Sequence, residues 1–392
     1  VTIAGNGGVV ANSSATYLFR NIGSGVENQE VTIIGLEYLD TGLVTNMDFM
    51  FDNCKAEEID VSQFHTEKVT SMSLMFSNCS NVESLDVSNF ETENVKSMGN
   101  MFEGCSSLTE LDLTNFNTSN VTNMGGMFMN CKATSIHLSS FDTKNVTNMR
   151  NMFNGCSVTS LDVSHFNTSN VTNMQGMFGN CKVQSLDLTS FNTSKVTNMY
   201  GMFQSCQATN IDLSSFNTSN VTTMNQMFTA CRATSLDLSS FNTSKVTDMY
   251  RMFLWCGNLI SLDISSFDTS NVTNMMLMFR ECISLEKLDI SNFKTLKVTS
   301  MDDMFASCRS LKELNYSNFE AIDGLSISNM FYECRSLKKL DIRKFDITNT
   351  TGHSAFWMSN VPVSCEIIVK NETIKQWFAE NHPSYTNIII GS

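Results

Sequence analysis

The sequence predicts an α/β solenoid of about 12 repeats, each contributing one strand and one short helix. The first observation is that all but one of the 13 cysteines recur every 25 or 26 residues, from Cys54 to Cys334. The second is that Phe and Met keep the same period, as in the row from Phe51 to Phe331. The third is that every repeat changes from a helical to an alternating apolar pattern. These observations predict one elongated array instead of separate globular domains.

A short helix is predicted at the start of each repeat. In one repeat, large apolar residues recur at spacings of 3, 3, 1 and 3: Val121, Met124, Met127, Phe128 and Cys131. This spacing places all five on one helical face, which must be buried. Residues 118–120, Thr-Ser-Asn, are of the types that accept hydrogen bonds from the first free N–H groups of a helix.

A strand is predicted after each Cys. Residues 160–164 alternate between polar and apolar side chains, which is the pattern of a half-buried strand. Leu161 and Val163 are expected to point inward, and Phe166 to close the repeat. Because the repeats follow without Gly-rich or Pro-rich breaks, we expect the strands to form a parallel β-sheet on one face and the short helices to stack on the other.

The two ends of the chain differ from the repeats. Residues 1–43 are interpreted as an N-terminal β cap, and residues 44–356 as the solenoid, with a last half-repeat ending at Phe356. Residues 357–392 are interpreted as a C-terminal cap with strands at 366–369 and 387–390 and a helix around 375–381. Caps of this kind keep the open ends of a stack from pairing with other chains.

The charge excludes some classes of partner. The net charge of −14 argues against nucleic acid and anionic membranes as partners. No stretch approaches about 18 consecutive apolar residues, so membrane insertion is not expected in this segment. The chain opens at Val1 with neither an initiator Met nor a signal segment, and we interpret it as a processed or trimmed piece.

The repeated motif VTNMxxMFxxC…LDLSxFNTSN resembles the BspA-like class of bacterial leucine-rich repeat surface proteins. The resemblance covers about residues 36–392, and departs from the pattern in the last full repeat, at Gly324 and Ile327. It implies a leucine-rich-repeat solenoid, secreted or attached to the cell wall, that binds other macromolecules of a host or of neighbouring bacteria and has no catalytic activity. It implies no shared binding residues.

The solvent side of the predicted sheet is the first candidate binding surface. Alternation places one carboxylate per repeat there, edged with hydroxyl groups, and the row is interrupted at His137. The candidate residues are Asp162, Asp187, Asp212, Asp237, Asp263 and His137. Stacked carboxylates are expected to share protons, to bind cations or to be screened by hydroxyl groups. Three interpretations remain open: a row that only keeps the sheet soluble and in register, a binding face for a basic protein patch or a glycan, and a row of Ca²⁺ sites.

The helical side offers a second candidate surface. Exposed aromatic and Arg residues are typical anchors of interfaces, and the candidates are Tyr200, Tyr250, Arg251 and Trp255. Scattered single residues of this kind are also ordinary on any surface.

The remaining reactive residues predict no chemistry. One thiol per repeat, flanked by Met and Phe, offers no cluster for a metal, so the Cys row is expected to be packing. Cys365 is out of register and stays undecided between a buried and a reactive role. The five His residues show no metal spacing or nucleophile motif. We therefore expect no catalytic residue, no metal and no cofactor.

The favoured function is that of a non-enzymatic extracellular adhesin, secreted or attached to the cell surface, which engages an extracellular protein or glycan through many weak contacts. The alternative is a structural spacer or self-assembling surface element without a ligand of its own. A third possibility is ice or mineral binding by the Thr row that includes Thr143, Thr168, Thr193 and Thr218.

Overall fold

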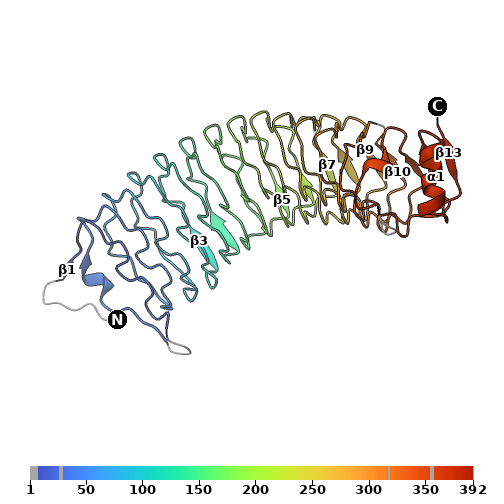
Figure 1. Cartoon of the computed structure of the whole chain (residues 1–392). Coiled ribbons are helices and arrows are strands. Elements are labelled where there is room, and N and C mark those ends of the chain that lie inside the picture. Colours follow the sequence, from blue (N-terminus) through green and yellow to red (C-terminus); the bar gives the residue numbers. More distant parts are fainter. Residues whose placement is uncertain (1–7, 26–29, 317, 354–356, 392) are drawn as a thin grey trace. The chain divides into compact units, whose positions relative to one another are not determined.

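The computed structural model describes residues 8–25, 30–316, 318–353 and 357–391, so that the half-repeat expected to end at Phe356 lies partly outside them. The chain is a parallel β-solenoid of about 14 rungs with little helix, where one rung is one repeat. It comprises two compact units, Val1–Lys195 and Val196–Ser392, and in each unit the rungs stack side by side (Figure 1).

The regular elements are short. The first unit contains strands β1 (Val9–Val10), β2 (Leu39–Asp40), β3 (Glu110–Asp112), β4 (Ser135–His137) and β5 (Ser185–Leu186), with the 3₁₀ helix η1 (Leu36–Tyr38). The second unit contains β6 (Asn210–Ile211), β7 (Ser235–Asp237), β8 (Ser261–Asp263), β9 (Lys287–Asp289), β10 (Glu313–Asn315), β11 (Lys339–Asp341), the 3₁₀ helix η2 (Ile347–Asn349), β12 (Glu366–Val369), α1 (Glu372–Asn381) and β13 (Ile388–Ile390).

Neighbouring strands pair in parallel, and equivalent positions of successive rungs lie opposite each other. In the second unit Leu236 of β7 pairs with Leu262 of β8, and Leu288 of β9 with Leu314 of β10. In β7 and β9 the central residue points inward while its two neighbours face solvent, because side chains alternate along a strand. The predicted parallel sheet on one face is confirmed. We call its solvent side the strand face.

The predicted helices are wrong. In the described repeats, the segment from the Val row to the Cys row forms turns, and we call this side the turn face. Alternate N–H groups donate to carbonyl oxygens of the next rung: Met98 to Asn123 (3.0 Å), Asn100 to Gly125 (2.8 Å) and Phe102 to Met127 (2.9 Å). The intervening N–H of Met101 donates to the carbonyl oxygen of Met98 (3.2 Å), three residues back. An α-helix would use these donors within its own segment, so bonding between rungs excludes it.

Left-handed residues also interrupt any helix on the turn face. Two positions per rung, four residues apart, have positive φ, as at Asn100 (58°) and Gly104 (66°) and again at Asn151 (54°) and Gly155 (69°). Asn and Gly tolerate this conformation better than other residues. In other rungs, residues such as Gln226 (59°), Ala230 (55°) and Leu277 (63°) take the same conformation, so the sequence does not mark these positions in every repeat.

The core consists of the predicted rows of identical side chains. The Met, Phe and Cys rows of the turn segments, from Met47 to Cys334, are buried. Successive Phe rings stack, with centroids 5.6 Å apart between Phe51 and Phe76 and 5.4 Å apart between Phe253 and Phe279. All 13 thiols are buried and free of disulfides, which confirms packing as the role of the Cys row. Cys365, left undecided from the sequence, is buried too, and this burial raises its pKa to about 12.

The Thr row is buried, so the interpretation of this row as an ice-binding surface is wrong. Thr143 and Thr168 are at most 1% exposed. The hydroxyl of Thr168 donates to the carbonyl oxygen of Asn192 (3.1 Å) and accepts the N–H of the same residue (2.8 Å). Each Thr of this kind therefore satisfies both backbone groups of a residue in the next rung.

Both ends contribute additional rungs, which explains why the count exceeds the predicted 12. The N–H groups of Ala15 and Phe19 donate to Asn46 (3.0 Å) and Met50 (2.7 Å) in the same pattern as the central rungs. At the other end β12 pairs in parallel with both β11 and β13. Helix α1 lies beside β13 and is capped at its start by Asn371, whose side chain accepts the N–H of Ile374 (3.0 Å) (Figure 1). The division at residues 43 and 357 stays a prediction.

Candidate functional site

Each unit presents Asp side chains along its strand face. Asp162 and Asp187 lie in the first unit, and Asp212, Asp237 and Asp263 in the second. One carboxylate oxygen of each accepts the N–H of the residue two positions further on; for Asp237 this donor is Ser239 (3.0 Å). The other distances are 3.0 Å for Asp162, 3.0 Å for Asp187, 2.9 Å for Asp212 and 3.0 Å for Asp263. The carboxylates thus close a tight turn at the end of each strand.

For Asp162, Asp212 and Asp237 these hydrogen bonds favour the charged carboxylate. Bonds from Ser164 lower the pKa of Asp162, and bonds from Ser239 lower that of Asp237. Bonds from the Ser214 backbone and side chain likewise lower the pKa of Asp212. Of the three alternatives for stacked carboxylates, screening by hydroxyl groups fits these residues, because hydroxyl and N–H donors within each rung favour the ionised form.

His137 replaces the Asp of β4. Its Nε2 atom lies 3.0 Å from a carboxylate oxygen of Glu110 on β3 and 3.2 Å from the hydroxyl oxygen of Ser135. His137 and Glu110 are both exposed, so the pair between them is a surface contact of small energy. His137, which interrupts the Asp row as the sequence indicates, therefore has a partner, Glu110, on the neighbouring rung.

The candidate residues of the turn face are only partly brought together. The guanidinium carbon of Arg251 lies 4.7 Å from the ring centroid of Tyr250, a cation–π contact. Trp255 is 53% exposed and has a left-handed backbone (φ 61°), which is unusual for a bulky residue. Tyr200 is separated from Tyr250 by the rung that contains Asn225. Of the four candidates, Tyr250 and Arg251 thus form a cation–π pair, and Trp255 is an exposed indole.

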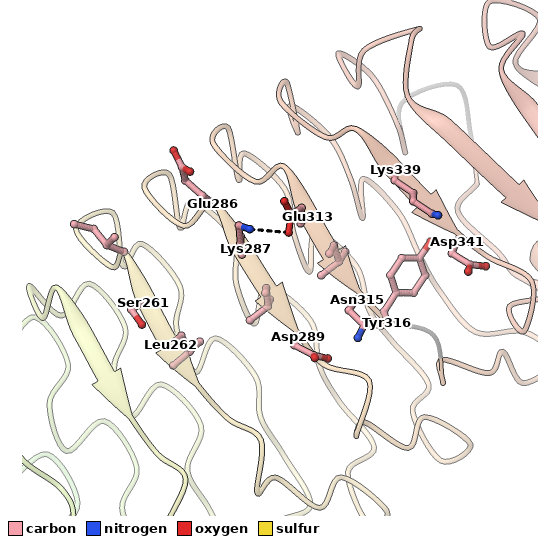
Figure 2. Close-up of a pocket in the computed structure, with 13 residues that line it drawn as sticks. Ser261, Leu262, Glu286, Lys287, Asp289, Glu313, Asn315, Tyr316, Lys339 and Asp341 are labelled. Carbon is pink, nitrogen blue, oxygen red and sulfur yellow. Dashed lines mark ion pairs between the residues drawn. The ribbon is translucent and has the colours of Figure 1, made fainter.

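A groove on the second unit was not predicted from the sequence. It has a volume of about 780 Å³ and runs along β8 to β11 (Figure 2). Ile260 and the central Leu residues of β8, β9 and β10 contribute apolar lining, and charged residues flank them. The charged lining residues are Glu286, Lys287, Asp289, Glu313, Lys339 and Asp341.

Most of the charged side chains around this groove are paired, three of the pairs between neighbouring rungs and one within a rung. Ion pairs join Glu286 to Lys312 (2.7 Å), Lys287 to Glu313 (3.0 Å), Lys339 to Glu366 (3.3 Å) and Asp341 to Arg343 (2.8 Å). Partial burial acts to raise the pKa of Asp341, but its hydrogen bonds with Arg343 lower it overall. Sequence reasoning had no means of finding these pairs without the register, because most of the partners are about one rung apart.

Tyr316 lines the same groove. It follows β10 at a position where Leu238, Ile264 and Ile290 stand in the preceding rungs. Its side chain is 3% exposed, and its hydroxyl has no hydrogen-bond partner among the described residues. In Figure 2 the ring lies between β10 and β11, with its hydroxyl end toward Asp341. The departure from an aliphatic row is the signal that the sequence offered for this residue.

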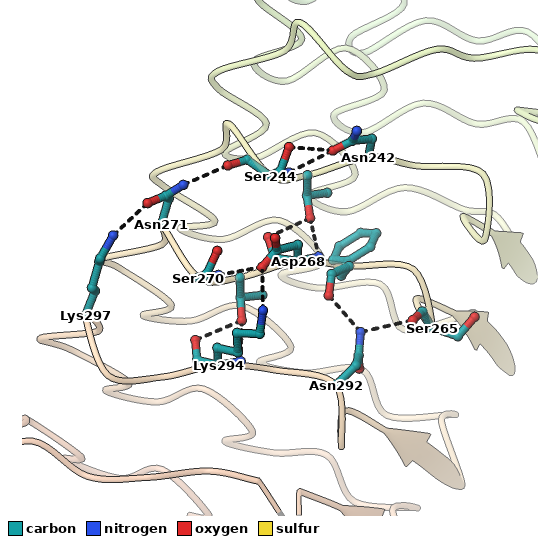
Figure 3. A network of polar contacts seen from close by, with 12 residues as sticks. Asn242, Ser244, Ser265, Asp268, Ser270, Asn271, Asn292, Lys294 and Lys297 are labelled. Atoms are coloured by element: carbon teal, nitrogen blue, oxygen red, sulfur yellow. Dashed lines mark hydrogen bonds and ion pairs between the residues drawn. The ribbon is translucent and has the colours of Figure 1, made fainter.

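A third polar surface lies in the loops between the strand face and the turn face. There Lys297 donates to the side-chain oxygen of Asn271 (2.7 Å), and Asn271 donates to the backbone oxygen of Ser244 (2.8 Å) (Figure 3). Asn292 bridges to the backbone oxygens of Ser265 (3.2 Å) and Phe267 (2.8 Å) in the preceding rung. These side chains tie adjacent rungs together, so their role is structural.

Nowhere in the described part of the chain do three or more His, Cys, Asp or Glu side chains gather as a metal ion would require. Among the same residues no helix has the length and apolar character needed to cross a membrane.

Three solved structures are similar in outline to this chain. The functional domain of InlJ from Listeria monocytogenes, which includes a cysteine ladder, has a TM-score of 0.32 and 16% identity, over 92% of this chain and 61% of that one. A leucine-rich cell surface protein from Faecalibacterium prausnitzii has a TM-score of 0.30 and 16% identity, over 88% of this chain and 85% of that one. The pneumococcal vaccine antigen PcpA has a TM-score of 0.30 and 13% identity, over 93% of this chain and 81% of that one. The chain thus spans less than two thirds of the InlJ chain.

No curated protein matches the sequence. A family model does match, in four overlapping stretches at residues 17–135, 107–210, 180–260 and 255–365. Together these stretches cover the described rungs with their rows of Met, Phe and Cys. The chain therefore belongs to DUF285, a family described as Mycoplasma protein of unknown function.

Proposed function

We propose that this protein is a non-enzymatic binding protein of the BspA-like leucine-rich repeat kind, secreted or attached to the cell surface, that engages an extracellular protein or glycan of a host or another microbe. One observation carries the proposal: each unit holds exposed, ionised Asp side chains at the same position of successive strands, fixed by hydrogen bonds within the rung. Charges that are already ordered lose little conformational entropy when a partner binds.

Repetition makes such a surface useful. Each rung offers one carboxylate with a neighbouring hydroxyl, a weak contact by itself. A long partner with regularly spaced cationic or hydroxyl groups can engage several rungs at once, which raises the overall affinity by multivalency. Binding through the Asp residues should therefore weaken with added salt and with fewer rungs.

The alternative is a spacer with no ligand of its own. It is favoured by the observation that every Asp of the row also closes the turn after its strand, so that the row has a role in folding. If the polar residues only stabilise the stacked rungs, the chain would hold other parts of a protein away from the cell without binding anything.

The deciding experiment measures binding of the purified, labelled protein to immobilised matrix proteins, mucins and glycans at low and high salt. Asp212, Asp237 and Asp263 are replaced together by Asn, which removes the charge but keeps an oxygen that accepts the same N–H. Asn315 occupies the equivalent position in β10, so Asn fits this site. The matched control replaces Glu91, Glu93 and Glu320, exposed residues outside the strand face, by Gln.

The proposal expects binding that weakens with salt, is lost in the Asn triple variant and is retained in the Gln triple variant. Equal loss in both triple variants would indicate an effect of net charge and not of the strand face. A folded protein that binds nothing on the panel would contradict the proposal and leave the spacer.

A further inference from the structure

Helix α1 packs on the turn segment around Trp357, whose carbonyl oxygen accepts the N–H of Phe331 in the rung before (2.9 Å). The Trp357 and Phe378 side chains are completely buried, with ring centroids 6.3 Å apart. His382 is the residue that caps the end of α1, and its ring centroid lies 6.1 Å from that of Trp357. His382 is only 7% exposed, so its imidazole is part of the contact that keeps α1 in place.

One hydrogen bond in this contact fixes the protonation state of His382. The indole Nε1–H of Trp357 donates to Nε2 of His382 (2.9 Å), and both residues are buried. An indole nitrogen can only donate, so Nε2 must carry a lone pair and the imidazole must be neutral, with its proton on Nδ1. A proton on Nε2 would place two donors face to face and a charge among apolar side chains. A protonated His382 is therefore incompatible with this attachment of α1.

The carboxylates near His382 have partners elsewhere. Helix η2, β12 and β13 pack against α1, and β13 has no ionisable residue. Glu366 of β12 forms an ion pair with Lys339 (3.3 Å), and Asp346, which caps η2, accepts the N–H of Thr348 (3.1 Å). The charged residues of α1 itself, none of them buried, are Glu372, Lys375 and Glu380. Among the described residues no carboxylate forms an ion pair with His382 that would stabilise its charged form.

His353, which follows η2, is the neighbouring group that acts on His382 through its charge. The ring centroids of both histidines lie close to that of Trp377, at 5.3 Å for His353 and 5.4 Å for His382. Burial, and to a smaller extent a positive charge on His353, lower the pKa of His382. The carbonyl groups at the end of α1 act in the opposite direction, but the net shift is downward.

We propose that His382 is a pH switch: protonation of its Nε2 atom breaks the hydrogen bond to Trp357 and releases helix α1, while the rungs stay folded. Release uncovers the apolar side chains of Trp357, Ile374 and Phe378, so that mild acid exposes an apolar surface at this end of the second unit. The Asp residues of the strand face titrate at lower pH, because their hydrogen bonds lower their pKa values. The switch does not depend on what the strand face binds.

Hydrogen exchange of the whole chain between pH 5 and pH 7.5 tests the switch. The folded-state pKa of His382 lies below the unfolded value of about 6.5, so its stabilisation of the attached helix is complete above that value and is lost as the pH falls through the folded pKa. The opening constant of α1, taken from exchange rates corrected for the intrinsic effect of pH, should rise by up to about tenfold per pH unit. The amides of β7 should stay protected over the same range.

Three variants identify the group that titrates. His382→Gln keeps an acceptor near the position of Nε2 but cannot titrate, so the opening of α1 should no longer depend on pH. His353→Gln and His65→Gln, the latter at an exposed residue of the first unit, are the matched controls and should keep the dependence. Loss of the dependence in His353→Gln and not in His382→Gln would overturn the inference. The same holds if α1 of the unchanged protein opens equally at pH 5 and pH 7.5.

A direct measurement decides the question if His382→Gln detaches α1 at every pH. In the unchanged protein, ¹⁵N NMR reports which imidazole nitrogen carries the proton, and the signal missing from His382→Gln identifies His382. At pH 7.5 His382 should be neutral with the proton on Nδ1, and it should titrate below about pH 6.5. A proton on Nε2 at pH 7.5, or a charged His382 in a protein whose α1 is still protected from exchange, would overturn the inference.

Discussion

Thr143 and Asn167, one rung apart, form a reciprocal pair: the Thr143 hydroxyl donates to the Asn167 carbonyl oxygen (3.1 Å) and accepts the Asn167 N–H (2.8 Å). The same pair of bonds joins Thr218 to Asn242 (2.9 and 2.8 Å). A buried side chain therefore replaces the backbone ladder where the chain bends between strand face and turn face. The stacking of rungs depends on these bonds as well as on the apolar rows.

Replacing Thr143 by Val should destabilise the protein. The substitution keeps the shape of the side chain but leaves two backbone groups of Asn167 buried without partners, which costs about 1–3 kcal/mol in the free energy of unfolding. Thr143→Ser keeps the hydroxyl and should cost less. Urea unfolding of the three proteins checks this, and equal midpoints for wild type and Thr143→Val would contradict the assigned role.

Acid should weaken the strand-face turns. The hydrogen bonds from Ser88 lower the folded-state pKa of Asp86, as those from Ser239 do for Asp237, below the unfolded value of about 3.9. The stabilisation is therefore complete above the unfolded pKa and is lost as the pH falls through the folded pKa. The melting temperature should drop below about pH 4. The triple Asn variant on the strand face cannot titrate at these positions and should lose less stability over the same range.

The thiols should not react in the folded protein. Burial raises the pKa of Cys131 to about 12, that of Cys206 to about 11 and that of Cys231 to about 12, so the reactive thiolate is scarce up to about pH 9. A disulfide reagent should label none of the 13 cysteines until denaturant is added. Rapid labelling of even one thiol in the native state would show that a rung opens.

Two substitutions of Trp255 distinguish the effect of its left-handed backbone on stability from the effect of its indole on binding. Both Trp255→Gly and Trp255→Ala remove the exposed indole, but only Gly adopts a φ of 61° without steric cost. The Gly variant should therefore be more stable than the Ala variant by about 1 kcal/mol. Unfolding midpoints measure the difference, and similar midpoints would mean that the backbone relaxes at this position.

The same two variants decide whether the turn face binds. If Tyr250, Arg251 and Trp255 form an interface, both variants lose a ligand of the matrix panel to the same extent, because both lack the indole. Full binding by both variants removes Trp255 as an anchor and leaves the strand face as the binding surface.

Much of the strand face could be predicted, whereas the groove could not. The alternation around Leu161 and Asp162 fixes which side chain faces solvent, so the Asp row follows from the sequence. The pairing of Lys287 with Glu313 depends on which residues of successive rungs lie opposite, and a shift of one residue would separate them. Tyr316 was passed over because a large ring at a core position gives no sign that its hydroxyl has no partner.

The sequence by itself determined the period, the buried rows of Met, Phe and Cys, and the side of each strand that faces solvent. These follow from the burial of apolar side chains, which a repeated pattern records directly. Only the tertiary structure decided that the segment from Val121 to Cys131 forms turns and not a helix. Both conformations bury the same apolar residues, and the choice depends on where the backbone N–H groups find acceptors. In the solenoid the acceptors lie in the next rung, a partner that no single repeat contains.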